Sequence, residues 1–147
     1  MPTASSATGP EAQIRVALED WSSALRAKDA KRVVAHHAAD YVQFSLAPPL
    51  ISDAADAEGL EAWFATWRGP LRHELHDLSI MASGDTAFCH GLTRLGGTKI
   101  DGEEPDIWFR LTLGLRKTGG AWKIVHEHES VPFYMDGSYK AAVDLAP

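Results

Sequence analysis

Two histidines, His126 and His128, lie two residues apart near the end of a predicted β-strand. They follow Trp122 and Ile124 at alternate positions of the stretch AWKIVHEHES. Because successive side chains of a regular strand point to opposite faces, all four are predicted to share one face. Imidazole titrates near neutral pH and transfers protons readily. The pattern therefore predicts acid/base chemistry or ligand binding in a cavity; the alternative is a pair of core or interface histidines with satisfied hydrogen bonds.

The same spacing is also compatible with a metal site. Histidines at positions i and i+2 of a strand can share a cation. Five residues separate Gly120 from His126, as in half of the cupin metal signature. However, Pro132 and Phe133 occupy the positions at which a glutamate would complete that signature. We therefore expect neither a metal ion nor another cofactor.

Three further polar residues lie within or next to apolar predicted strands. His90 alternates with Phe88 and Leu92, which places it on an apolar face. Arg110 differs in parity from its aliphatic neighbours. It therefore points either outward into a subunit contact or, across a bulge in a bent sheet, into a cavity toward an anionic ligand group. Asp40 either caps a turn or orients a histidine.

Aromatic residues on core-facing stripes are the second group of candidates. They either fill a core or line an apolar cavity, where they would stack against a ligand. These residues are Trp21, Phe44, Trp63 and Trp67. Glu127 and Glu129, which alternate with the two histidines, are assigned to a solvated or interfacial face. The histidines assigned to the surface or to a sheet edge are His36, His37, His73 and His76.

The elements that must position these residues are predicted from periodicity. Apolar residues at helical spacing, with only Val16 off the stripe, indicate a first helix. Turn signals centred on Gly84, Gly102 and Gly119 separate four long strands. The predicted helices span 10–28, 29–37 and 58–68, and the predicted strands span 40–46, 71–82, 86–98, 105–117 and 121–132. This order indicates an α+β fold with helices on one face of an antiparallel sheet.

Composition excludes several classes of protein. The chain has 147 residues, which fits a single domain, placed here at residues 10–147 after a disordered segment 1–9. A net charge of −6 with dispersed basic residues disfavours nucleic acid as a partner. The sequence has neither a membrane-spanning apolar stretch nor a signal peptide, and its single cysteine rules out an intrachain disulfide. We expect a cytoplasmic protein that binds no membrane.

Several of these motifs resemble a known family. They are Trp21 in the first helix, Trp63 and Trp67 in the third, and the ending from Gly120-x-Trp122 to His126-x-His128-x-Ser130. The chain resembles the SnoaL-like, ketosteroid-isomerase-like branch of the NTF2-like superfamily. The resemblance implies a cone, in which three N-terminal helices pack on a strongly curved, mostly antiparallel sheet that encloses a cavity. It also implies a homodimer, since relatives commonly pair through the outer face of the sheet.

The resemblance says less about chemistry, because this superfamily includes isomerases, dehydratases, cyclases and non-catalytic binding domains. Steroid isomerases place a general-base Asp on the first strand and pair a Tyr with a protonated Asp. This chain has Ser45 at or beside the base position and Trp21 near the Tyr position, so steroid isomerisation is disfavoured. Dehydratase relatives use a His paired with an Asp and another His, which Asp40, His90 and His128 could supply.

The sequence therefore predicts binding of a small apolar or aromatic molecule, with possible cofactor-free acid/base chemistry of the isomerase, dehydratase or cyclase type. His128 would exchange the proton, Asp40 or His90 would orient or assist it, and Arg110 would stabilise an enolate-like oxygen. His126 and the four aromatic residues named above would contact the ligand. The alternative is a non-catalytic domain that binds a ligand or assembles subunits. The sequence does not decide whether the protein is an enzyme.

Overall fold

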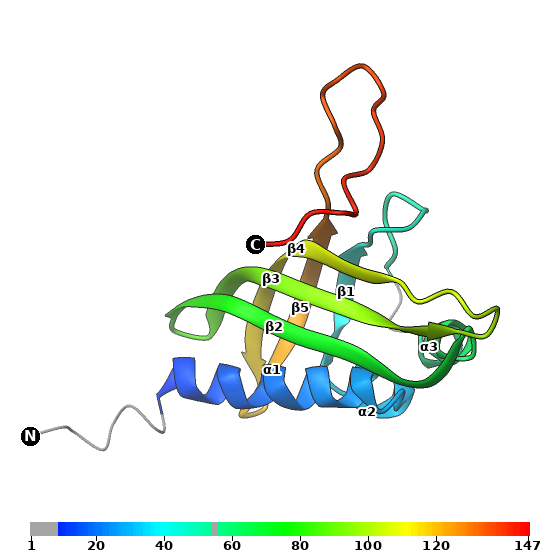
Figure 1. The fold of residues 1–147 in the computed structure, drawn as a ribbon. Helices are drawn as coiled ribbons and strands as arrows, with labels where there is room; N and C mark the ends of the chain where they lie inside the picture. The colour runs from blue at the N-terminus through cyan, green and yellow to red at the C-terminus, as the bar shows by residue number, and fades with distance from the viewer. Residues whose placement is uncertain (1–8, 54–55) are drawn as a thin grey trace, which may run out of the picture.

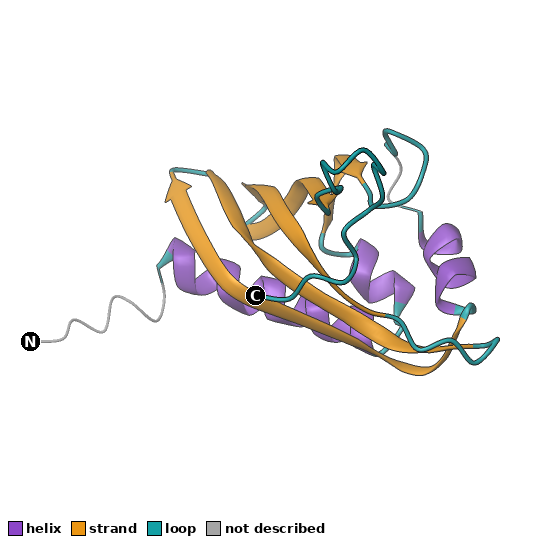
Figure 2. Cartoon of the chain, turned by 45° about the horizontal axis from the view of Figure 1, so that its top comes forward, coloured by secondary structure: helices purple, strands orange, loops and turns teal. Residues whose placement is uncertain are grey.

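The fold consists of three helices packed against one curved five-stranded sheet (Figures 1 and 2). The computed structural model describes residues 9–53 and 56–147. The helices are α1 (Pro10–Arg26), α2 (Ala30–Val34) and α3 (Ala57–Phe64), and the strands are β1 (His37–Phe44), β2 (Trp67–Ser83), β3 (Thr86–Lys99), β4 (Asp106–Thr118) and β5 (Ala121–Ser130). The predicted α+β class is confirmed. Residues 1–9 were predicted to be disordered, and of these only residue 9 lies within the described ranges.

The strand order is β1-β5-β4-β3-β2. Strands β2 to β5 form successive antiparallel hairpins, while β1 pairs with β5 in parallel. Helix α1 lies along β2 on the inner face of the sheet, and α2 and α3 lie near its end (Figure 1). No helix of the described residues covers the opposite face, which is called the outer face below (Figure 2). Within the described residues, no helix has the length and apolar character that crossing a bilayer requires.

Helix α1 follows the predicted amphipathic pattern. Pro10 begins the helix, where its missing N–H has no cost, and Glu11 in the first turn complements the helix dipole. Ile14 is 0% exposed and Trp21 is 2% exposed, whereas Val16, off the apolar stripe, is 72% exposed. Local spacing therefore predicted correctly which side of this helix packs on the sheet.

The ends of the two short helices differ from the prediction. Asp29 caps α2 as expected, since its side chain accepts a hydrogen bond from Arg32 N at 3.2 Å, but the helix ends at Val34 and β1 begins at His37. Likewise α3 ends at Phe64, and Trp67 belongs to β2, where it pairs with Lys99 of β3. The backbone groups after each helix form hydrogen bonds with neighbouring strands instead of extending the helix. Tertiary context therefore overrides the helical pattern of the sequence.

Strand β4 alternates as its sequence indicates. Its inward side chains, Phe109, Leu111, Leu113 and Leu115, are all buried and form much of the core. Arg110 and Thr112 lie on the outer face and are exposed. Of the two orientations open for Arg110, the structure therefore has the outward one.

Strand β5 does not alternate as predicted, because it contains a β-bulge. Ile124 pairs with Leu115 of β4, but His126 pairs with the preceding residue, Gly114, so Val125 is an extra residue in the ladder. An extra residue reverses the alternation beyond it. Trp122 and Ile124 point inward before the bulge, whereas Glu127 points inward after it. Because of this bulge, the prediction that Ile124, His126 and His128 share one face is wrong.

Candidate functional site

A cavity of about 530 Å³ lies between the helices and the inner face of the sheet. This volume is within the range of small-molecule sites. Every helix and strand contributes at least one side chain to its lining. Most of the lining is apolar, and its aromatic side chains include Trp21, Tyr41, Trp63, Trp67 and Phe109. One group of its polar side chains lies around β5 and β1 and another at His73 of β2 beside α1, while Ser52, Asp56 and Lys99 line the cavity elsewhere.

The first polar group is centred on Glu127, whose side chain is buried. Tyr41 donates its hydroxyl proton to Glu127 Oε1 across 3.3 Å, and Gln43 Nε2 donates to Glu127 Oε2 across 2.9 Å. Both donors come from β1, which lies next to β5 in the sheet. Because both carboxyl oxygens accept hydrogen bonds, Glu127 is held in one position.

Glu129, two residues further along β5, also lines the cavity. Burial raises the pKa of its carboxyl group well above the usual range, and the charge of Glu127 and a hydrogen bond with it raise this pKa further. Glu129 therefore keeps its proton to a higher pH than an ordinary glutamate does. A carboxyl group with a raised pKa can donate a proton, and a neighbouring carboxyl group can accept one.

Two other side chains adjoin this carboxyl pair. His37 stacks on Tyr41 with 3.9 Å between ring centroids, and both of its nitrogens are buried without a hydrogen-bond partner among the described residues. Burial lowers the pKa of His37, only partly opposed by the charge of Glu127. Burial also raises the pKa of Tyr41, and the two glutamates raise it further. Both rings are therefore neutral, and Tyr41 remains a donor.

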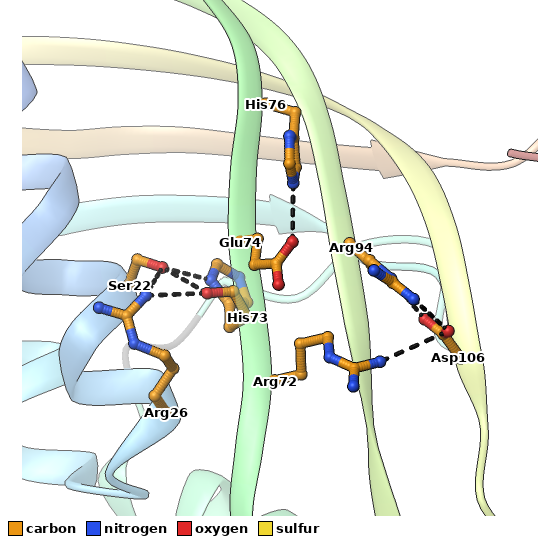
Figure 3. Close-up of polar contacts among 8 residues, drawn as sticks. All are labelled: Ser22, Arg26, Arg72, His73, Glu74, His76, Arg94 and Asp106. Carbon is orange, nitrogen blue, oxygen red and sulfur yellow. Dashed lines mark hydrogen bonds and ion pairs between the residues drawn. The ribbon is translucent and has the colours of Figure 1, made fainter. Parts of the chain in front are cut away.

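The second polar group lies under α1, where Ser22, Arg26 and His73 meet (Figure 3). His73 Nδ1 is 2.7 Å from Ser22 Oγ. Burial, together with the nearby Arg26 charge, lowers the pKa of His73 to about 4. His73 also lines the cavity, so a neutral imidazole is available there at physiological pH.

The three predicted tryptophans line the cavity, although their role in ligand binding remains a prediction. Trp63 and Trp67 meet edge to face with 5.9 Å between ring centroids. Lys99 Nζ lies 3.8 Å from the centroid of the Trp67 ring and donates to Thr66 Oγ1 across 3.0 Å. The walls thus combine aromatic faces with one cation that is already engaged.

The predicted histidines lie on the outer face. His126 Nδ1 is 2.8 Å from the backbone oxygen of Val42, and Phe44 meets His126 and His128 edge to face at 4.7 and 5.1 Å. Phe44 and His128 line a neighbouring groove with residues 45–51 and Glu129, and this groove shares residues 45–47 and Glu129 with the cavity. The structure thus brings Phe44, His126 and His128 together, but none of them lines the cavity itself.

The remaining predicted residues also lie away from the cavity. Asp40 forms a two-pronged ion pair with Arg116 at 3.1 and 3.2 Å, which lowers the pKa of the Asp40 carboxyl. His90 is exposed and pairs with Thr112 of β4, and Arg110 Nε donates to Ser130 Oγ across 3.1 Å. These side chains do not converge with one another or with the cavity.

Sequence reasoning missed most of the polar cavity residues. Glu127 and Glu129 were assigned to a solvated or interfacial face, and His37 and His73 to the surface, yet all four line the cavity. The bulge at Val125 accounts for the glutamates. The two histidines are covered by packing between distant segments, for which the local sequence has no signal. The described residues also contain no group of three or more His, Cys, Asp or Glu side chains arranged to hold a metal ion.

Replacing Glu129 with Gln is expected to make stability less sensitive to rising pH. Below about pH 4, Glu129 is protonated in both the folded and unfolded states. As the pH rises, the unfolded chain releases this proton before the folded protein does, so wild-type stability falls. Gln keeps a donor toward Glu127 but does not titrate, so the variant should gain stability relative to wild type as the pH rises above about 4.

Urea unfolding of both proteins across this pH range measures the effect. The lowered pKa of His73 acts in the opposite direction, since stability falls as pH drops from 6.5 toward about 4, but it is common to both proteins and cancels in the difference. A stability difference that does not change with pH would show that Glu129 titrates normally in the fold.

Comparison with known proteins identifies the fold. A family model described as a SnoaL-like domain matches residues 14–134. An NTF2-like protein of unknown function from Pseudomonas putida KT2440 has a similar solved structure, with 35% sequence identity and a TM-score of 0.82 over 93% of this chain and 96% of that chain. No curated protein matches the sequence.

Two more distant structures have names that suggest a function. A ketosteroid isomerase-like protein from Erwinia carotovora atroseptica is 24% identical, with a TM-score of 0.68 over 81% of this chain and 93% of that chain. A candidate scytalone dehydratase from Novosphingobium aromaticivorans is 20% identical, with a TM-score of 0.72 over 92% of this chain and 93% of that chain. At these identities the likeness concerns the fold alone, and it confirms the predicted NTF2-like cone.

Proposed function

The chain belongs to the SnoaL-like family, and from its cavity we propose that it binds a small, uncharged cyclic molecule and transfers a proton on it without a cofactor. One observation carries this proposal. Glu127 and Glu129 both line an aromatic cavity from β5, the first held by two hydrogen-bond donors and the second with its pKa raised by burial. Paired carboxyl groups in such surroundings are suited to general acid/base catalysis.

In the proposed mechanism, Glu127 accepts a proton from a carbon of the substrate and Glu129 delivers its own proton to a second substrate atom. The pair then holds one proton again, shifted from Glu129 to Glu127, and exchange within the pair restores the starting state. Delivery to carbon or oxygen gives an isomerisation, and delivery to a leaving hydroxyl gives water and a dehydration. Tyr41 and Gln43 hold Glu127 in position during both steps.

These roles replace those assigned from the sequence. Proton exchange was predicted for His128 with Asp40 or His90, and oxygen stabilisation for Arg110, but none of these side chains lines the cavity. No arginine is among the described residues that line the cavity. In the proposed mechanism Glu127 acts as a carboxylate, which would repel a ligand carboxylate and so favours an uncharged substrate. The isomerase and dehydratase names of distant relatives are compatible with proton transfer on cyclic molecules.

Turnover of 5-nitrobenzisoxazole tests the proposal. A base removes the ring C–H proton of this uncharged bicyclic molecule; the C–H electrons form a nitrile as the N–O bond breaks, and a coloured phenolate is released. We expect saturable turnover, faster than with acetate at equal carboxylate concentration, and competitive inhibition by 2-acetylnaphthalene.

A cavity-filling variant locates the reaction. Leu60 lines the cavity from α3, whereas Ala62 of the same helix is exposed, so Leu60→Trp should abolish turnover and Ala62→Trp should not. Turnover no faster than with acetate, or unaffected by Leu60→Trp, would contradict a cavity-based acid/base enzyme.

A second function, subunit assembly, is favoured by apolar side chains left uncovered on this chain. Met81 and Phe88 pair across β2 and β3 on the outer face and are 63% and 46% exposed. The segment after β5 projects away from the sheet before its C-terminal end returns toward the strands (Figure 1), and it exposes Phe133, Met135 and Tyr139. These surfaces support the expected homodimer.

Sedimentation equilibrium should detect a dimer of the wild-type protein, and Phe88→Asp should weaken this dimer because it places a charge in the apolar contact. A wild-type protein that is monomeric at every concentration would contradict subunit assembly.

A further inference from the structure

We propose that His126 and His128, on the outer face of β5, together bind a divalent transition-metal ion of the class of Cu²⁺, Ni²⁺ or Zn²⁺. Neither histidine lines the cavity, so this site goes beyond the proton-transfer function and does not depend on it. The proposal also revises the expectation drawn from the missing glutamate of the cupin signature. Two imidazoles can hold such an ion when water molecules fill its remaining coordination positions.

The β-bulge at Val125 leaves both imidazole rings on the open side of the sheet. His126 pairs with Gly114 of β4 and His128 pairs with Thr112, and the centroids of the two rings are 6.2 Å apart. With a metal–nitrogen bond of about 2.1 Å, the centroids of two ligating rings lie about 5 Å apart at a tetrahedral angle and about 6.4 Å apart when the rings are opposite each other. The observed separation therefore allows both rings to reach one cation.

A hydrogen bond prepares His126 as a ligand. Its Nδ1 is 2.8 Å from the backbone oxygen of Val42. A carbonyl oxygen can only accept, so Nδ1 carries the proton and Nε2 of the neutral ring is unprotonated. Metal-binding histidines typically have this arrangement, because the bond from one nitrogen fixes the tautomer and the orientation of the ring for the other.

The surroundings hold the two rings together and leave them accessible. Phe44 of β1 meets His126 and His128 edge to face, with 4.7 and 5.1 Å between ring centroids. His128 is exposed, so a small rotation of its side chain can bring a ring nitrogen to the cation. Gly114, the neighbour of His126 on β4, has no side chain that could cover the ring.

The ligand atoms determine the class of ion. Imidazole nitrogen suits Cu²⁺, Ni²⁺ and Zn²⁺, whereas Mg²⁺ prefers oxygen ligands. Arg110 is a cation on the same face, but it donates to Ser130 across 3.1 Å, and salt screens the repulsion between exposed charges. The net charge of −6 favours the approach of a cation to the chain as a whole.

Two other histidines of the sheet provide matched controls. His76 Nε2 is 2.8 Å from Glu74 Oε1, so this ring already has a carboxylate partner (Figure 3). His90 is exposed, and the residues two positions before and after it are Phe88 and Leu92. Neither ring has a second imidazole two residues away on its strand, so each would act as a single surface ligand.

Isothermal titration calorimetry of the full chain without an affinity tag tests the site. Wild type should bind one Ni²⁺ per chain, bind Cu²⁺ more tightly than Ni²⁺ or Zn²⁺, and not bind Mg²⁺. His126→Gln and His128→Gln should each weaken Ni²⁺ binding at least about tenfold, since even the loss of an outer hydrogen-bond partner of a ligand costs that much. His76→Gln and His90→Gln should leave the Kd within about twofold of wild type.

Paramagnetic broadening locates the ion independently of the variants. Substoichiometric Cu²⁺ should first broaden the backbone amide signals of residues 126–128 in an NMR spectrum of the wild-type protein. Absence of saturable Ni²⁺ binding, or a wild type that binds no more tightly than the single variants, would overturn the shared site. Broadening centred on His76 or His90 would also overturn it.

Discussion

Replacing Glu127 with Gln is expected to lower the turnover of 5-nitrobenzisoxazole by about a hundred- to ten-thousand-fold. The substitution keeps the size of the side chain and an oxygen that can accept from Tyr41 or Gln43. It removes only the carboxylate that takes up the proton. The Kd of 2-acetylnaphthalene should therefore change little, so that the loss falls on kcat rather than on binding.

Variants of the residues singled out by the sequence provide the control. Asp40 is ion-paired with Arg116, and His128 is exposed on the outer face. Asp40→Asn and His128→Gln should therefore leave turnover within about twofold of wild type, as is usual for surface substitutions. Normal turnover by Glu127→Gln, together with strong loss in His128→Gln, would favour the histidine mechanism over the carboxyl pair.

The Ile14→Ala substitution is expected to lower the free energy of unfolding by roughly 2–5 kcal/mol. Ile14 is fully buried in the core cluster between α1 and the sheet. Truncation removes buried methyl and methylene groups and leaves a cavity that the surrounding core fills only partly. Because α1 also carries Trp21 and Ser22, partial loosening of the helix should weaken binding of 2-acetylnaphthalene as well. Urea unfolding followed by circular dichroism measures the stability change.

Val16 offers a matched control on the same helix. It is also β-branched but lies on the exposed side. Val16→Ala should change stability by less than about 0.5 kcal/mol, with a small gain from the higher helix propensity of Ala. Equal losses from Ile14→Ala and Val16→Ala would mean that α1 does not pack on the sheet through its predicted stripe.

Local periodicity predicted most of the fold because the period of an element is a property of neighbouring residues. The stripe of α1, the Asp29 cap and the alternation in β4 all depend on contacts within a few positions of the chain. The structure confirms each of them. The predicted ends of α2 and α3 were less accurate, because hydrogen bonds to distant strands determine where β1 and β2 begin.

The sequence by itself therefore determined the α+β fold, the sheet-facing side of α1 and the aromatic character of the cavity. Only the tertiary structure decided which polar residues enter that cavity. One extra residue in the ladder, Val125, reverses the faces of β5, so that Glu127 and Glu129 face inward and His126 and His128 face outward. Side-chain direction along a strand depends on its register with neighbouring strands, and that register is fixed by pairing with β4 and β1 rather than by the strand's own sequence.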